Sequence, residues 1–316
     1  MTLVPRKVSA ALLSACLVLR TAFAVAQPLA RASSSQPGTP AVPSWEQKYR
    51  DRCEPYQGDP RGWPARRPAD ARAVNLMAQL SACSWEVSLD TTGSVIASVY
   101  VHKPVDLILP FAPEVSPRWQ IAHCSNDVSD REAPKLAVSA VIASGDGYLV
   151  GYNSGEFGGG LLHFRANGKF VESLTDENVV RIVGTATGVV AFTGLAHGLN
   201  DAGLALGLRF GKGRWTTTRV RLPGEPLVVL AEAGGSFLVV TTSHVARLTH
   251  DFRLVLVHRG AWGGNVHPNS IVRDASGTIY IGMSYAVARL RPAQNGFLEE
   301  WLAPAGPQWP AAAPAG

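Results

Sequence analysis

The sequence lacks the short motifs that identify the common enzyme classes. It contains no GxSxG nucleophile motif, no HExxH motif, no Walker A loop and no glycine-rich dinucleotide fingerprint after a strand. Its four cysteines form no CxxC pair and no Cys/His ligand spacing, which disfavours structural zinc. Basic residues are not interleaved with aromatic ones, so nucleic acid is not an expected partner. We therefore assign no catalytic residues from the sequence.

Charge is also sparse. Charged residues make up 17 % of the 316 residues and hydrophobic residues 46 %, which is the balance of a folded, soluble chain. The net charge of +5 carries little information, because Arg6, Lys7 and Arg20 lie in a segment predicted to be removed, which would leave 26 basic against 24 acidic residues. Glycine is abundant instead, with 31 residues, and Val, Thr and Ile between turn residues favour short strands.

The N-terminus has the order of a secretory signal. Arg6 and Lys7 precede an apolar run over residues 8–25, and Ala24-Val25-Ala26 supplies small residues at a cleavage site. Arg20 divides the run well short of the ~20 apolar residues of a membrane span. We therefore expect a signal peptide over residues 1–26 and a periplasmic or secreted protein that is not integral to the membrane.

The cysteines fit an oxidising compartment. Removal of residues 1–26 leaves Cys53, Cys83 and Cys124, which predicts one disulfide and one free thiol. Three pairings are open, and Cys53–Cys83 is slightly favoured because it would hold the N-terminal stretch. A lipoprotein is the minor alternative, because Leu13-Ser14-Ala15-Cys16 fits a lipidation site at Cys16.

Both ends of the mature chain are low in complexity. Residues 27–45 are rich in Pro, Ser and Ala and predict a flexible linker, and residues 303–316 form a Pro/Ala-rich tail. Between the linker and residue 85 lies an N-terminal extension, 46–84. Its first part is proline-rich and predicted to be irregular, and Asp70 could cap a short helix over about residues 71–82.

One pattern recurs five times between residues 85 and 302. A short apolar strand leads into a tight glycine turn and a second apolar strand. The turn glycines are Gly93, Gly147, Gly188, Gly235 (or its neighbour Gly234) and Gly277. Their spacings of 54, 41, 47 and 42 residues are close to the ~40 to 50 residues of a propeller blade.

Further strands complete the units. Two apolar segments follow each of the last four hairpins, and Ala166-Asn167-Gly168 and Gln294-Asn295-Gly296 are the turns expected between third and fourth strands. The pattern predicts an all-β fold, a β-propeller of five or six four-stranded blades over residues 85–302. A β-sandwich with fortuitous spacing is the alternative.

The stretch from 85 to 302 resembles the bacterial propeller-repeat families of the NHL, YVTN and two-component-regulator type. In these families an apolar strand is followed by Asp or Ser with Gly and then by an aromatic-aliphatic strand. The segment most similar to them is NSIVRDASGTIYIGMSYAVARL, from Asn269 to Leu290. A Trp-Asp repeat is disfavoured because no Trp-Asp pair ends a blade. The resemblance implies a fold and no particular activity.

Antiparallel blades place their loops on two faces. Nearly all long connections of this chain belong to one of them, which we call the long-loop face: 101–104, 125–134, 153–160, 175–178, 195–203, 223–226 and 259–268. It holds eight acidic residues against the basic Lys103, Arg131 and Arg259, and four histidines, His102, His197, His244 and His267. The acidic residues are Asp127, Asp130, Glu132, Glu156, Asp176, Glu177, Asp201 and Glu225. Such a face suits a divalent metal, a cationic ligand or a basic protein, and solvated polar loops would look the same.

Two loops stand out on this face. The first, 152–160, sets an acid and an aromatic residue among glycines, and the second, 259–269, carries an aromatic residue that could be an exposed ligand platform. Packing of that aromatic side chain over a blade edge is the alternative. The candidate ligand-binding residues are Tyr152, Glu156, Phe157, His197, Asp201, Trp262, Asn265 and His267.

These features predict an exported, non-catalytic binding protein. We expect a monomer that binds a protein or glycan of the bacterial envelope through the long-loop face; an inhibitor that occludes an envelope enzyme would be one version. The alternative is a metal-dependent hydrolase of the lactonase type, because some six-bladed propellers resembling this one hold calcium or zinc on the axis. Glu156, Asn269 and Asp201 could then be ligands. No cofactor is expected apart from such a divalent metal.

Overall fold

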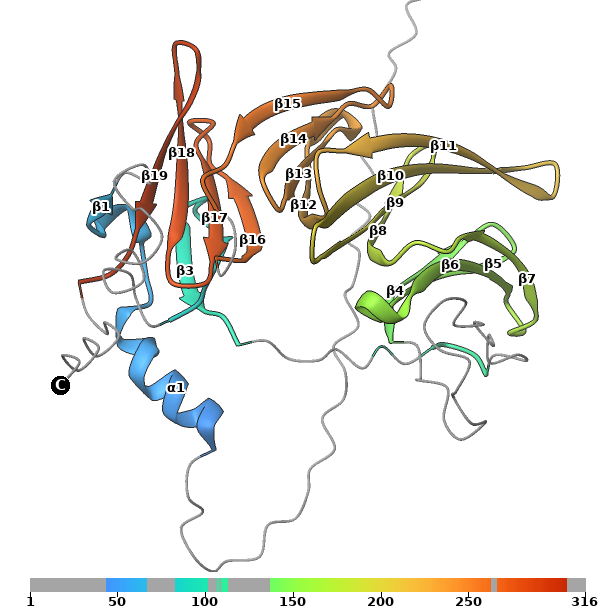
Figure 1. Cartoon of the computed structure of the whole chain (residues 1–316), viewed down its shortest axis with the longest axis horizontal. Coiled ribbons are helices and arrows are strands. Elements are labelled where there is room, and N and C mark those ends of the chain that lie inside the picture. The colour runs from blue at the N-terminus through green and yellow to red at the C-terminus, as the bar shows by residue number, and fades with distance from the viewer. Residues whose placement is uncertain are drawn as a thin grey trace, which may run out of the picture. The chain divides into compact units, whose positions relative to one another are not determined.

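The computed structural model describes residues 44–66, 83–101, 107, 109–112, 137–262 and 266–305, and its strands form five antiparallel sheets (Figure 1). The first sheet has two strands, β2 (Trp85–Leu89) and β3 (Val95–Val99). The second and third contain β4 (Val138–Ser144), β5 (Gly147–Asn153), β6 (Gly159–Arg165), β7 (Phe170–Thr175), then β8 (Val179–Thr185), β9 (Gly188–His197), β10 (Asn200–Gly211) and β11 (Arg214–Leu222). The fourth and fifth contain β12 (Pro226–Ala231), β13 (Phe237–Thr241), β14 (His244–Leu248), β15 (Leu254–Arg259), then β16 (Pro268–Arg273), β17 (Ile279–Met283), β18 (Val287–Ala293) and β19 (Gly296–Leu302).

Each of the last four sheets is a meander in which consecutive strands are neighbours, as in a propeller blade. All five predicted hairpins are present: β2–β3, β4–β5, β8–β9, β12–β13 and β16–β17. The predicted third and fourth strands are present in the last four units as well. The predicted all-β propeller is confirmed, with five sheets in the part of the chain that the structure describes.

The first strand of each sheet is its inner strand. Contacts run from β4 to β8, β8 to β12, β12 to β16, and β16 to β2, so the N-terminal hairpin packs beside the C-terminal blade. The backbone N–H of Val87 in β2 donates to Oγ of Ser270 in β16 at 2.8 Å. Apolar residues fill the spaces between neighbouring blades, and for this reason β13 and β17 are buried along their whole length.

The residues that form the turns explain why the repeat can be recognised in the sequence. In the β2–β3 turn, Oδ1 of Asp90 accepts from the N–H groups of Thr92 and Ser94 at 2.8 and 2.9 Å. In the β16–β17 turn, Asp274 bonds in the same way to Ser276 and Thr278, at 2.9 and 3.0 Å. The glycine of each turn has a positive φ, 81° and 83°. A short acid and a glycine thus close both turns.

The N-terminal extension contains a helix that the sequence analysis did not predict. Residues expected to be irregular form α1 (Trp45–Cys53), the 3-10 turns Glu54–Tyr56 and Pro60–Gly62, and β1 (Ala65–Arg66), which pairs with β19. Ser44 caps α1 by accepting from the N–H of Gln47 at 3.1 Å. The helix has one buried residue, Cys53, and its apolar face is limited to this residue and Tyr49, one turn earlier. No helix in the described ranges is long and apolar enough to cross a membrane.

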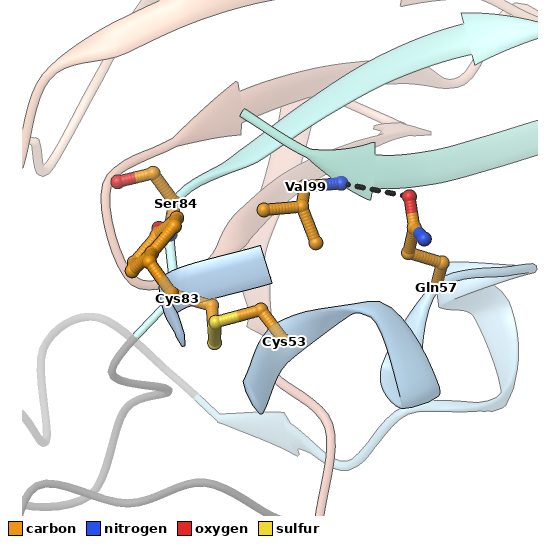
Figure 2. Close-up of a disulfide and its surroundings, with 6 residues drawn as sticks. Cys53, Gln57, Cys83, Ser84 and Val99 are labelled. Atoms are coloured by element: carbon orange, nitrogen blue, oxygen red, sulfur yellow. Dashed lines mark hydrogen bonds between the residues drawn. A yellow bond between two sulfur atoms is a disulfide. The ribbon is translucent and has the colours of Figure 1, made fainter. Parts of the chain in front are cut away.

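A disulfide fastens this extension to the first hairpin (Figure 2). Cys53 and Cys83 are joined with a Cα–Cα distance of 5.9 Å, and both are buried among the apolar residues of β2 and β3. Beside the disulfide, Oε1 of Gln57 accepts from the N–H of Val99 at 3.1 Å. This is the pairing that the sequence analysis favours. Cys16, Cys124, the signal segment and the helix expected over 71–82 lie outside the described residues.

Candidate functional site

The long-loop face is more regular than predicted. Residues 195–203, expected as an irregular segment, continue the β9–β10 hairpin as far as the pair His197 and Asn200, so that Gly198 and Leu199 form its tip. Gly198 has a φ of +60°, which lets the chain reverse within two residues. The hairpin is therefore a defined support for the residues at its tip.

A contact between two exposed side chains, an ion pair only when the histidine is protonated, joins this hairpin to the neighbouring blade. Nε2 of His197 lies 3.2 Å from Oε2 of Glu156, which belongs to the 3-10 turn Gly155–Phe157 between β5 and β6. The side-chain amide of Asn178 donates to the carbonyl of Gly155 at 2.8 Å and supports the turn. Phe157 is 57 % exposed and Leu199 is fully exposed. The contact thus brings together two loops that each present an apolar side chain to solvent.

A carboxylate network lies between the third and fourth sheets. Oδ1 of Asp201 accepts from the N–H of Glu225 at 2.7 Å, and its Oδ2 accepts from the hydroxyl of Thr242 at 2.6 Å. Oε2 of Glu225 accepts from the N–H of Ala196 at 3.0 Å. Gly224 is required here, because a Cβ at this position would lie 2.3 Å from the hydroxyl of Thr242. The network connects β9, β10, the β11–β12 connection and the β13–β14 turn.

The pKa values of two ionisable groups, one in the network and one beside it, are shifted against their charged forms. Burial raises the pKa of Glu225, and the neighbouring carboxylate of Asp201 raises it further against the hydrogen bond from Ala196. Burial lowers the pKa of His244, and the positive charge of Arg259 acts in the same direction. Nδ1 of His244 lies 2.8 Å from the hydroxyl of Ser243. In both cases burial acts against the charged form of the group.

Two candidate aromatic residues are part of the core. Trp262, considered as an exposed ligand platform, is 3 % exposed, and its indole N–H donates to the carbonyl of Thr241 at 2.9 Å. It packs in the cluster that joins the last two blades, so the interpretation as a platform is wrong and packing at a blade edge is right. Tyr152 is also buried, with Val150 and Leu162, and burial raises its pKa.

The remaining candidate binding residues and metal ligands do not lie together in one site. His267 is exposed, and its carbonyl accepts from the N–H of Ser284 at 3.2 Å. Asn265, His102, Lys103 and the acidic segment 125–134 lie outside the described residues. Of the proposed metal ligands, Glu156 pairs with His197, Asp201 belongs to the carboxylate network, and Oδ1 of Asn269 accepts from the hydroxyl of Ser270 at 2.8 Å. Within the described ranges no three His, Cys, Asp or Glu residues are arranged to hold a metal ion.

Sequence reasoning missed Leu199. The sequence carries no distinct signal for it, because single exposed leucines are common on protein surfaces. Glu225 was counted among the acids of the face, but its bond to Ala196 and its proximity to Asp201 depend on two blades meeting.

Comparison with known proteins adds the following. No family model and no curated protein sequence matches the chain. Solved structures similar to it include the extracellular domain assigned to a hybrid two-component system of B. thetaiotaomicron, at 12 % identity and a TM-score of 0.35, over 49 % of this chain and 22 % of that one. A streptogramin B lyase is 16 % identical, with a TM-score of 0.35, over 53 % of this chain and 55 % of that one. An inactive virginiamycin B lyase from Staphylococcus aureus is 14 % identical, with a TM-score of 0.35, over 54 % and 57 %. At this level of similarity no activity, substrate or partner carries over to this chain.

Proposed function

We propose that the protein is an exported propeller that binds a protein partner through its long-loop face. The observation that carries the proposal is the approach of Glu156 and His197 to within 3.2 Å, because it places side by side two loops with exposed Phe157 and Leu199. Exposed aromatic side chains such as Phe157 are enriched at protein interfaces. Exposed acids of the long-loop face, among them Asp176 and Glu177, suit a partner with a basic rim.

Export is part of this proposal. The disulfide between Cys53 and Cys83 supports it, because such bonds persist in oxidising compartments. The predicted signal over residues 1–26 supports it independently. N-terminal sequencing of protein isolated from cells should begin near Gln27, whereas a sequence that begins at Met1 contradicts export.

The binding surface is tested by capture of a partner from an envelope extract. Phe157→Ala and Leu199→Ala should each weaken capture about tenfold or more, because truncation of an interface anchor typically costs about 2 kcal/mol. Leu256→Ala is the matched control, since Leu256 is an exposed leucine on β15 away from these loops. Capture lost with Leu256→Ala but kept with Leu199→Ala would show that another surface binds. Hydrolytic turnover that depends on bound metal and on Glu156 would replace the proposal with the hydrolase.

A further inference from the structure

A second charged surface lies on the hairpin formed by β10 and β11. From Gly203 to Leu222 the chain contains five basic residues and no acidic residue. All five are exposed: Arg209, Lys212, Arg214, Arg219 and Arg221. Three exposed threonines, Thr216, Thr217 and Thr218, lie among them on β11. We call residues 203–222 the basic ribbon.

Among the described residues, the cations of the ribbon have no acidic partners, whereas most arginines of the other blades are paired with an acid. Arg247 and Arg273 both bond to Glu232, and Arg289 and Arg291 both bond to Glu300. By contrast, no side chain of the five ribbon cations forms an ion pair or hydrogen bond with another residue in the described part of the chain. Their charge is therefore not neutralised within this region and is available to an external anion.

The ribbon also extends beyond its blade. Pairing between β9 and β10 ends at Val189 and Leu208, whereas β10 and β11 remain paired as far as Gly211 and Arg214. Figure 1 shows this hairpin projecting past β8 and β9. Lys212 occupies the tip, with a φ of 53°. The projecting part can be approached from more than one side.

The outer edge arranges its cations regularly. β11 is the outermost strand of its sheet and pairs with β10 alone. Thr217, Arg219 and Arg221 occupy every second position of β11 and therefore lie on the same face of the strand. The two arginines are about 7 Å apart along the strand, the rise of two residues. A row of guanidinium groups with hydroxyl groups beside them suits a linear ligand with repeated anionic groups.

The geometry points to an acidic polysaccharide, a chain with repeated carboxylate or sulfate groups, as the ligand of the basic ribbon. No exposed large apolar side chain lies between Gly203 and Leu222, which disfavours insertion into a lipid surface. Export places the ribbon where polysaccharides are the abundant polyanions, so this inference rests on the export part of the proposed function. It is independent of the protein-binding loops, because Phe157 and Leu199 lie on other elements.

The experiment measures binding to immobilised polygalacturonate and dextran sulfate, with neutral dextran as the blank. Wild-type protein should bind the acidic chains and not the neutral one, and salt at about 0.3 M should weaken binding through screening. Arg219→Ser/Arg221→Ser should weaken it about tenfold. Lys48→Ser/Lys169→Ser removes the same charge from exposed positions on α1 and the β6–β7 turn and should leave binding unchanged. Equal thermal midpoints of the two double variants confirm that both fold.

Several outcomes overturn the inference. Equal losses in both double variants mean that net charge alone binds the polymer. Tighter binding to phosphatidylglycerol vesicles or to duplex DNA assigns the ribbon to another polyanion. Self-association at low salt that Arg219→Ser/Arg221→Ser abolishes assigns it to the acidic long-loop face of a second copy. Phe157→Ala should bind the polysaccharides normally, so failure of the protein-binding proposal leaves this result intact.

Discussion

The carboxylate of Glu299 in β19 lies 2.8 Å from Nε2 of His258 in β15, the outer strand of the preceding blade. The same carboxylate accepts from the indole N–H of Trp301 at 2.7 Å and from the backbone N–H of Ala261 at 3.1 Å. The side chains of Glu299 and His258 are 8 % and 15 % exposed. This one carboxylate joins two blades at their outer edges and fixes the chain that leads to Trp262.

Glu299→Ala should therefore destabilise the fold. The substitution leaves the donors of Trp301, Ala261 and His258 without their acceptor, and an unpaired buried donor costs about 1–3 kcal/mol. We expect a loss of about 3 kcal/mol in the free energy of unfolding, measured with urea. Glu86→Ala, at an exposed position of β2, is the control and should change it by less than about 0.5 kcal/mol. Similar losses in the two variants would contradict the role of Glu299.

His244 should make stability depend on pH. Its pKa is lowered in the folded protein from an ordinary value of 6.5, mainly by burial. Its contribution is therefore present above pH 6.5 and is lost as the pH falls through the lowered pKa, because the unfolded chain then binds the proton more readily. Between pH 6.5 and the lowered pKa, thermal midpoints of wild type should fall more steeply on acidification than those of His244→Gln. Parallel curves for the two proteins would show that His244 does not couple folding to protonation.

The disulfide should contribute strongly to stability. It joins residues 30 positions apart in the sequence, and a closed loop of this length restricts the unfolded chain by about 3 kcal/mol. Cys53→Ala/Cys83→Ala should lower the free energy of unfolding by that amount, and reduction of wild type should have the same effect. Reduction of the double variant provides the control, since it should change nothing further. An unchanged urea midpoint in the double variant would refute the prediction.

Gly147 is required by close packing at the start of β5. A Cβ there would lie 1.9 Å from the carbonyl oxygen of Phe164 in the neighbouring strand, so Gly147→Ala must displace backbone. We expect a loss of about 2 kcal/mol or more in the free energy of unfolding. Gly211→Ala is the matched control, because a Cβ at Gly211 meets no atom within 4 Å and its φ is not positive. Tolerance of both substitutions in urea unfolding would contradict the observed approach of β5 and β6.

The hairpins could be predicted from the sequence, whereas helix α1 and the position of Trp262 could not. The five hairpins were found because each has a glycine turn between two short apolar strands. In two of them Asp90 and Asp274 close the turn with side-chain bonds to residues two and four positions along the chain. Helix α1 was missed because its apolar face is limited to Tyr49 and Cys53, which pack against residues of β2 and β3 and a cysteine 30 positions away. Trp262 was misjudged because the carbonyl that its indole binds belongs to a different strand, β13.

The sequence by itself determined the repeat and the number of visible hairpins, because strand alternation and turn residues are properties of neighbouring positions. It left three cysteine pairings open. Only the tertiary structure decided which side chains meet. Glu156 and His197, Asp201 and Thr242, and Glu299 and His258 lie 41 positions apart in each case and come from different blades. Their contacts depend on how blades pack, which no local pattern encodes. The same holds for the basic ribbon, whose charge could be counted in the sequence but whose lack of partners became visible only in the folded chain.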